Sequence, residues 1–215
     1  FLKKVKELYG NDNEESTIKY LQDLGIDFFR SSRGGGTAYI GPGQLVTYPI
    51  VDYYRIVNTE FGVNKYKELI DRIMYEVLKE DFHLNVKIVE VAKELEEKNN
   101  EMRKNRMDVW LELNGKNYKI GGKGIHHSRN VAYNGFSIYI KPYSLEGFKH
   151  ILACGYDKDE LDVTCIEDEL KREVSIAEVR DKVLDKIKDK FNYNTLIYIS
   201  PEDLERIEMN SELLA

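Results

Sequence analysis

The chain has 215 residues with a net charge of −6, and 42% of its residues are hydrophobic. That length and composition predict one folded domain with a single core. The acidic balance argues against a general nucleic-acid binder, because such proteins neutralise phosphates with Lys and Arg. Two cysteines are too few for a disulfide framework, and no apolar run approaches the roughly 18 residues of a membrane span. We therefore expect free thiols, a reducing compartment and no membrane partner.

The first half of the chain predicts a succession of helices and strands. Apolar residues at helical spacing indicate the helices, and alternating or β-branched residues indicate the strands. In chain order these are helices over residues 1–9 and 17–24, strands over 26–30, 37–40 and 44–51, a helix over 64–80 and a strand over 84–91. The helix over 64–80 has the clearest apolar stripe.

The second half opens with residues 92–107, which are almost wholly charged or amide and predict a solvated insertion. The remaining elements are a hairpin of strands 109–113 and 116–120 around an Asn-Gly turn, a strand over 135–140, a capped helix over 175–191, a strand over 195–200 and an acidic tail over 201–215. Hairpins outnumber strand-helix-strand units. The predicted fold class is therefore α+β, a mixed, largely antiparallel sheet with helices packed on it.

The stretch from Arg33 to Gln44 reads RGGGTAYIGPGQ. Three consecutive glycines and a Gly-Pro-Gly turn surround a predicted four-residue strand, although glycine weakens strands. Two tight hairpin turns would explain either cluster taken alone. Both clusters together, with Arg33 at one end and Gln44 at the other, indicate backbone that lies close to a ligand.

Cys154 follows an apolar pair and precedes Gly155. A cysteine in apolar surroundings is more often a core residue than a nucleophile. The glycine favours the nucleophile, since it permits a sharp, exposed turn. The adjacent His126 and His127 point to opposite sides of any strand, and no Cys/His spacing predicts a metal site.

These stretches resemble the sequence signature of the lipoyl(octanoyl) transferases, a family with a biotin/lipoate ligase-like fold. The family's R-G-G and Y-x-G-P-G-Q motifs match residues 33–44, its V-W and K-I motifs match 109–110 and 119–120, and its C-G and V-T motifs match 154–155 and 163–164. Ile40 and Asn134 stand where the family usually has histidine, and Cys165 stands at its serine position. Family members also carry a helix and a strand that would precede Phe1.

The resemblance implies that Cys154 is the nucleophile and that Lys119 is the catalytic lysine, which lowers the thiol pKa and shuttles protons. It also implies three blocks of substrate-binding residues. These are Arg33, Gly34, Gly35, Gly36, Thr37, Ala38, Tyr39 and Ile40; Gly122, Lys123 and Gly124; and Asn134, Gly135 and Phe136. The thiol of Cys154 and the ammonium of Lys119 must then meet beside the glycines.

In such transferases an octanoyl group passes from acyl carrier protein to the cysteine. A lysine on a lipoyl domain of a 2-oxoacid dehydrogenase complex, or on the glycine cleavage H protein, then accepts it. The resemblance thus implies an acyltransferase of the cytoplasm, or of an organellar matrix in a eukaryote, that uses no ATP and no metal. Two alternatives share the fold: an ATP-dependent lipoate or biotin protein ligase, and a binding module without turnover.

Overall fold

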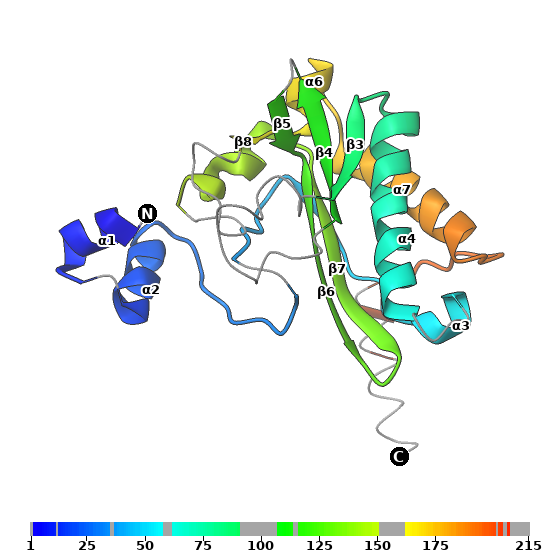
Figure 1. Ribbon diagram of the computed structural model, residues 1–215, viewed down its shortest axis with the longest axis horizontal. Helices are drawn as coiled ribbons and strands as arrows, with labels where there is room; N and C mark the ends of the chain where they lie inside the picture. The colour runs from blue at the N-terminus through cyan, green and yellow to red at the C-terminus, as the bar shows by residue number, and fades with distance from the viewer. Residues whose placement is uncertain are drawn as a thin grey trace.

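Figure 1 shows the computed structural model, which describes residues 2–11, 13–34, 37–57, 62–90, 107–113, 116–150 and 162–200, together with 202, 203 and 206. Gly35, Gly36 and Cys154 lie outside these ranges. So do residues 92–106 of the predicted insertion and most of the predicted acidic tail.

The strands form two small sheets joined through one continuous stretch of chain. They are β1 (Gln44–Thr47), β2 (Val51–Asp52), β3 (Val86–Glu90), β4 (Met107–Leu113), β5 (Lys116–Lys119), β6 (Gly121–Ser128), β7 (Val131–Tyr139) and β8 (Asp162–Val163). In one sheet β1, β2 and β6 each pair antiparallel with β7. In the other the order is β3-β4-β5-β8, and only β5 and β8 are parallel. The predicted mixed, largely antiparallel α+β fold is confirmed.

The two longest helices, α4 (Gly62–Glu76) and α7 (Ile176–Lys190), cover one side of these strands. The helical elements are α1 (Leu2–Tyr9), α2 (Glu14–Asp23), α3 (Tyr53–Val57), α4 (Gly62–Glu76), the π-helical η1 (Val77–Asp81), the 3₁₀-helical η3 (Pro142–His150), α6 (Ile166–Leu170) and α7 (Ile176–Lys190). Figure 1 shows α4 and α7 on one side of the strands, with η3 and the chain leading to β1 on the other. We call the surface of β5, β6 and β7 that is turned away from α4 and α7 the site face.

The core lies between α4, α7 and the two sheets. Ile70 and Met74 of α4 pack there with Ile138 of β7 and Val183 of α7, and all four are at most 1% exposed. Burial of an aliphatic side chain of this size contributes about 1.5–3 kcal/mol to stability. Alternate residues of β7 enter this core, so its pleat fixes which of its side chains reach the site face.

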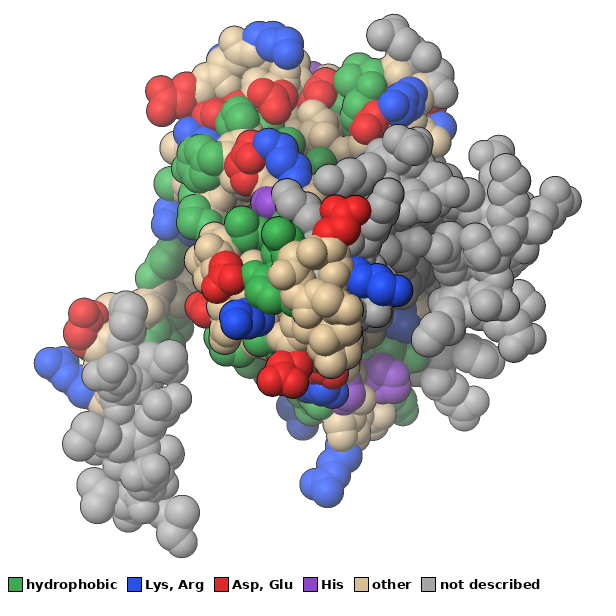
Figure 2. Space-filling view, turned by 90° about the vertical axis from the view of Figure 1, so that its left-hand side faces the viewer, with side chains coloured by type: hydrophobic (Ala, Val, Ile, Leu, Met, Phe, Trp, Pro, Cys, Tyr) green, Lys and Arg blue, Asp and Glu red, His purple; other side chains and the backbone are tan. Residues whose placement is uncertain are grey.

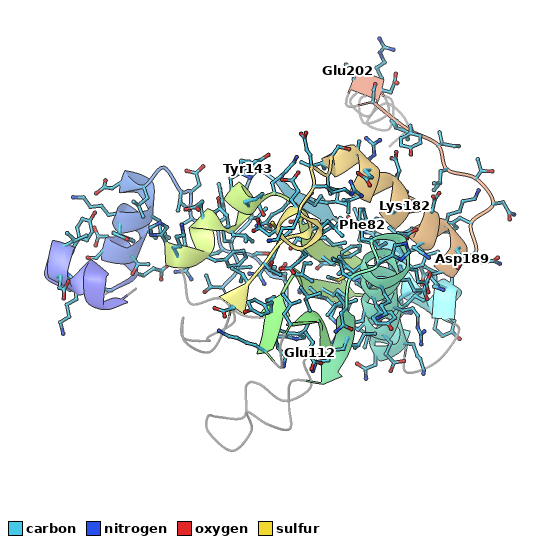
Figure 3. All side chains as sticks on the ribbon, turned by 90° about the horizontal axis from the view of Figure 1, so that it is seen from above. Phe82, Glu112, Tyr143, Lys182, Asp189 and Glu202 are labelled. Carbon is cyan, nitrogen blue, oxygen red and sulfur yellow. The ribbon has the colours of Figure 1, made fainter. Side chains whose placement is uncertain are left out.

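The helices α1 and α2 form a pair beside the rest of the molecule. Seen from above in Figure 3, η3 with the labelled Tyr143 lies between this pair and the strands. Tyr20 and Leu21 of α2 form a small apolar cluster, and the Tyr20 hydroxyl lies 3.2 Å from Nδ1 of His150 in η3. In the described part of the chain, no helix is both long and apolar enough to span a bilayer.

Three predicted strands are wrong. Residues 26–30, 37–40 and 195–200 belong to no strand, and Phe29 and Ile197 are each 82% exposed. Aromatic and β-branched residues favour a strand only where a neighbouring strand offers a partner. The strand predicted over 135–140 instead begins at residue 131, because Arg129 and Asn130, with φ of 50° and 67°, form a two-residue hairpin turn after β6.

A buried ion pair ties α4 to β6. Lys123 Nζ donates to Asp71 Oδ2, and the two side chains are 13% and 1% exposed. Removal of one partner from such a pair leaves an uncompensated buried charge. By contrast, the pair of Lys65 with Glu68 on the outer surface of α4 is more than half exposed on both sides, where water screens the attraction.

We predict that Asp71→Asn lowers the free energy of unfolding by roughly 3–5 kcal/mol, because Lys123 loses its counter-charge. The matched variant Glu68→Gln, which breaks the exposed pair, is expected to cost less than about 1 kcal/mol. Urea unfolding followed by circular dichroism measures both. Equal losses in the two variants would contradict a stabilising role for the buried pair.

Candidate active site

Lys119 and Gly122 come together on the site face. Ile120 is fully buried in the core and Gly121 lies against Met74 of α4, so the chain turns both of these residues toward α4 as it passes from β5 to β6. A Cβ atom at Gly122 would lie 3.5 Å from Cε and 3.8 Å from Nζ of Lys119. The predicted catalytic lysine therefore extends over a glycine of the predicted binding block.

Lys119 is only 3% exposed. Its cross-strand neighbour on β4 is Trp110, and its main-chain oxygen accepts a hydrogen bond from the Thr164 N–H at 2.9 Å. The parallel pairing of β5 with β8 brings Val163 alongside it. Two of the motif blocks of the sequence are thus neighbours in space around one buried lysine side chain.

An aromatic cluster lies beside Gly122, next to the Lys119 side chain. Tyr139, 3% exposed, packs on Phe148 of η3 with ring centroids 5.0 Å apart, and Phe148 packs on Tyr39 at 5.7 Å. The hydroxyl oxygen of Tyr139 would lie 3.4 Å from a Cβ atom at Gly122. Sequence analysis did not single out Tyr139, because its position in an alternating strand carries no motif of its own.

The Arg33-Gly34 segment runs along β6. The Gly34 N–H donates to the Ile125 carbonyl at 3.1 Å, and the Arg33 side chain would lie 2.9 Å from a Cβ atom at Gly124. Gly122 and Gly124 share one face of β6. These two glycines, with Arg33 beside one and Lys119 beside the other, form the glycine floor of the site face.

The Gly-Pro-Gly turn holds Tyr39 against η3. A Cβ atom at Gly41 would lie 2.2 Å from the Tyr39 hydroxyl oxygen, and one at Gly147 would lie 2.1 Å from its ring. Gln44, 7% exposed, donates from Nε2 to the carbonyls of Tyr39 and Ser144 at 3.3 and 3.1 Å. The glycines in this stretch therefore make room for Tyr39, and Gln44 fastens the turn to η3.

Several predicted binding residues do not reach the site face. Lys123 points to the opposite side of β6, where Asp71 pairs with it, and Phe136 is buried in the core at 2% exposure. We therefore remove both from the binding set. Both removals follow from strand alternation, because the side chain next to a site residue along a strand points to the opposite face of the sheet.

Other predicted residues are exposed or have a structural explanation of their own. Thr37, Ala38 and Ile40 are exposed, and Ile40 is 50% exposed. Gly135 is required by packing, because a Cβ atom there would lie 2.1 Å from the Thr47 carbonyl oxygen. Asn134 has φ of 59°, a conformation that asparagine tolerates better than most residues.

The adjacent histidines diverge as expected. His126 faces Ser32, whose carbonyl oxygen lies 2.5 Å from Nδ1, while the His127 ring packs on Tyr53 of α3 at a centroid distance of 6.2 Å. Within the described ranges, no group of His, Cys, Asp and Glu side chains could hold a metal ion.

Cys165 is fully buried in the cluster of Tyr139 and Phe148. Burial raises the pKa of its thiol to about 12. A thiol with that pKa stays protonated at neutral pH and does not act as a nucleophile. Cys154, the other cysteine of the chain, lies outside the described residues, so its distance from Lys119 remains a prediction.

Comparison with known proteins shows the family of the chain. A family model described as the lipoyl protein ligase A/B catalytic domain matches residues 9–188. An octanoyltransferase of Alkaliphilus metalliredigens is 30% identical over 172 residues, which cover 80% of this chain and 68% of that protein. An octanoyltransferase of Dictyoglomus turgidum is 30% identical over 202 residues, covering 89% and 75%. The chain belongs to the lipoyl(octanoyl) transferase family.

Not every relative in this family is covered to the same extent. An octanoyltransferase of Cytophaga hutchinsonii is 34% identical over 166 residues, and the match covers 76% of this chain but only 59% of that relative.

Solved structures extend the likeness to the fold. A lipoate-protein ligase A bound with ATP has a TM-score of 0.61 at 16% identity, with 87% of this chain and 68% of that chain covered. A bi-partite lipoate protein ligase of Thermoplasma acidophilum has a TM-score of 0.56 at 16% identity, covering 87% and 67%. The predicted biotin/lipoate ligase-like fold is thereby confirmed.

The described surface on the side that carries α1, α2 and η3 has no dominant charge. Figure 2 looks at the molecule from that side and shows acidic, basic and apolar side chains interspersed over the described surface. A broad field of one sign would steer an oppositely charged partner. The described part of this side shows no such one-sided cluster of charge.

We predict that Gly122→Ala lowers transfer activity at least tenfold while the unfolding temperature changes little. The added methyl would enter the space between Lys119 and Tyr139 at ordinary contact distances of 3.4–3.8 Å. Gly121→Ala, whose methyl would lie 2.6 Å from the Ser137 carbonyl oxygen, is expected to destabilise the fold instead. An active, stable Gly122→Ala variant would contradict a reaction at this glycine.

A second ion pair fixes η3 next to the site. Lys141 Nζ lies 2.6 Å from Oε1 of Glu167, and the same oxygen accepts the Val174 N–H at 2.7 Å. The hydrogen bond from Lys141, followed by that from Val174, holds the pKa of Glu167 below its ordinary value. This pair joins the residue that precedes η3 to the first turn of α6.

We predict that the unfolding temperature of Glu167→Gln lies below that of the unchanged protein at pH 7, and that the difference shrinks as the pH falls. A carboxylate with a depressed folded-state pKa stabilises the fold above its unfolded pKa of about 4.3. That stabilisation disappears as the pH passes down through the folded-state pKa. Thermal unfolding between pH 7 and pH 3 measures it. A difference that stays constant over this range would assign the effect to something other than the carboxylate charge.

Proposed function

We propose that this chain transfers an octanoyl group from acyl carrier protein to the lysine of a lipoyl domain, through a thioester on Cys154. The observation that carries the proposal is the buried Lys119 amine over the glycine floor, in a chain that belongs to the octanoyltransferase family. The buried Cys165 thiol, with its raised pKa, leaves Cys154 as the cysteine suited to attack.

The first half-reaction forms the acyl-enzyme. The neutral amine of Lys119 takes the thiol proton of Cys154 and becomes an ammonium, and the thiolate attacks the carbonyl carbon of the carrier thioester. A new carbon–sulfur bond forms to Cys154 and the bond to the carrier sulfur breaks. The departing carrier thiolate takes the proton back from Lys119, so no net charge remains in the buried site.

The second half-reaction forms the amide. The neutral amine of the acceptor lysine attacks the Cys154 thioester, the carbon–sulfur bond breaks, and Lys119 passes a proton from the amine to the Cys154 sulfur. A thioester is already activated, so we propose that neither ATP nor a metal takes part. A free Cys154 thiol requires a reducing compartment, which supports the cytoplasm as the place of action.

The acceptor partners belong to the same proposal. The family activity calls for a lipoyl domain of a 2-oxoacid dehydrogenase complex or a glycine cleavage H protein. The Arg33-Gly34 segment lies beside Gly124 at the border of the glycine floor. We propose that the acceptor lysine enters past this border.

A ligase of the same fold is the alternative. The ligases that match this chain in structure do so at 16% identity, which supports the shared fold and not a shared reaction. The relatives at 30% identity are octanoyltransferases. A ligase would consume ATP to activate a free acid, whereas the transferase needs only the thioester.

We predict that incubation with octanoyl-carrier protein adds one octanoyl group to the chain, as measured by intact mass. Cys154→Ala should abolish the gain and Lys119→Met should slow it by about 100-fold or more, while the matched variant Cys165→Ala keeps it. Formation of an octanoyl-adenylate from octanoate and ATP, with no mass gain from the carrier, would support the ligase. Binding of the carrier without any gain would support a module without turnover, and either result would overturn the proposal.

A further inference from the structure

The Tyr139 hydroxyl and the Lys119 amine converge on one glycine. A Cβ atom at Gly122 would lie 3.4 Å from the phenol oxygen and 3.8 Å from the amine nitrogen. The two groups come from different strands, since Tyr139 ends β7 and Lys119 ends β5. Both side chains are 3% exposed. Two polar groups, each largely removed from water, therefore approach the same bare stretch of backbone.

Contacts of both its ring and its main chain hold Tyr139 in place. The ring packs on Phe148 at an interplanar angle of 52°, the main-chain N–H donates to the Ile120 carbonyl at 3.0 Å, and Gln44 is the cross-strand neighbour on β1. A ring fixed in this way presents its hydroxyl in one direction. The rigid aromatic cluster thus determines where the phenol oxygen stands relative to Gly122.

We propose that Tyr139 is a further catalytic residue, whose hydroxyl donates a hydrogen bond to the carbonyl oxygen of the acyl group as negative charge develops there. This inference rests on the proposed function, because it places the acyl carbonyl above Gly122. The adjacent Lys119 ammonium polarises the phenol and makes it a stronger donor. Preorganised donors of this kind stabilise the transition state without having to reorient.

The step balances without proton transfer from the phenol. When the thiolate adds to the carbonyl carbon, the π electron pair moves to the carbonyl oxygen, and the Tyr139 O–H shares its hydrogen with that oxygen. When the carbon–sulfur bond to the carrier breaks, the pair returns and the hydrogen bond weakens. Lys119 delivers the proton to the departing sulfur, so the phenol and the amine have separate tasks.

The competing explanation is that Tyr139 only fills the aromatic cluster. In that case the ring matters and the hydroxyl does not. Tyr139→Phe separates the two, since it keeps the ring and removes one oxygen atom. Tyr66 provides a matched control on the other side of the sheet: it is 0% exposed in the core against α7, and burial raises the pKa of its hydroxyl, which has no hydrogen-bond partner among the described residues.

The experiment measures single-turnover formation of the octanoyl-enzyme from octanoyl-carrier protein for the unchanged protein, Tyr139→Phe and Tyr66→Phe. We expect Tyr139→Phe to lower the rate constant about 100-fold, as loss of one oxyanion donor does. Its KM should change little, because the hydrogen bond strengthens only in the transition state. Tyr66→Phe should react at the rate of the unchanged protein, and thermal unfolding checks that both variants are folded.

Three other outcomes would each contradict one of the claims made for Tyr139 or for the reaction. A Tyr139→Phe rate within about threefold of the unchanged protein would overturn the role of the hydroxyl. A raised KM with an unchanged rate constant would assign Tyr139 to the wall of the binding groove instead. If the unchanged protein itself forms no octanoyl-enzyme, the proposed function fails before the question of Tyr139 arises.

Discussion

The structure depends on how the chain passes from β5 in one sheet to β6 in the other. Between β5 and β6, Ile120 and Gly121 both turn toward α4, and strand alternation is interrupted at that point. Only glycine fits at position 121, because the Ser137 carbonyl oxygen lies within 2.6 Å of where a Cβ atom would be. As a result Lys119 and Gly122 face the same way, although an unbroken alternation would separate them.

This crossing divides the molecule into a stabilising side and a chemical side. The apolar residues of α4, α7 and β7 form the core, and the buried pair of Lys123 with Asp71 reinforces it. On the site face, β5 carries Lys119, β6 carries Gly122 and Gly124, and β7 carries Tyr139. A rigid core on one face holds reactive groups on the other to within the small tolerance that catalysis requires.

Much of this arrangement could be predicted from the sequence, and the failures have physical reasons. The amphipathic stripe over 64–80 and the capping box at Ser175 predicted α4 and α7 well, because both signals are local. The motif that contains Lys119 also predicted that this lysine lies beside the glycines of the site. Strands over 26–30 and 195–200 were predicted wrongly, since pairing depends on distant partners. The β6–β7 turn at Arg129 and Asn130 lacks the usual glycine, so its left-handed conformation was not expected.

Errors within the site have the same origin. A motif marks a stretch of chain, whereas a pleated strand turns neighbouring residues to opposite faces. Lys123 and Phe136 were therefore included although they point into the helix-covered side. Tyr139 and Phe148 were missed, because they meet Gly122 and Tyr39 from other elements of the chain, and no local pattern predicts that proximity.

The central claim is that acyl transfer takes place on the site face, above Gly122. The most direct test is a crystal structure of the chain trapped as its octanoyl thioester. The account predicts that the acyl chain lies over Gly122 and Gly124, with its carbonyl oxygen beside Tyr139 and its thioester sulfur beside Lys119. An acyl group bound anywhere on the side covered by α4 and α7, or a thioester far from Lys119, would contradict it.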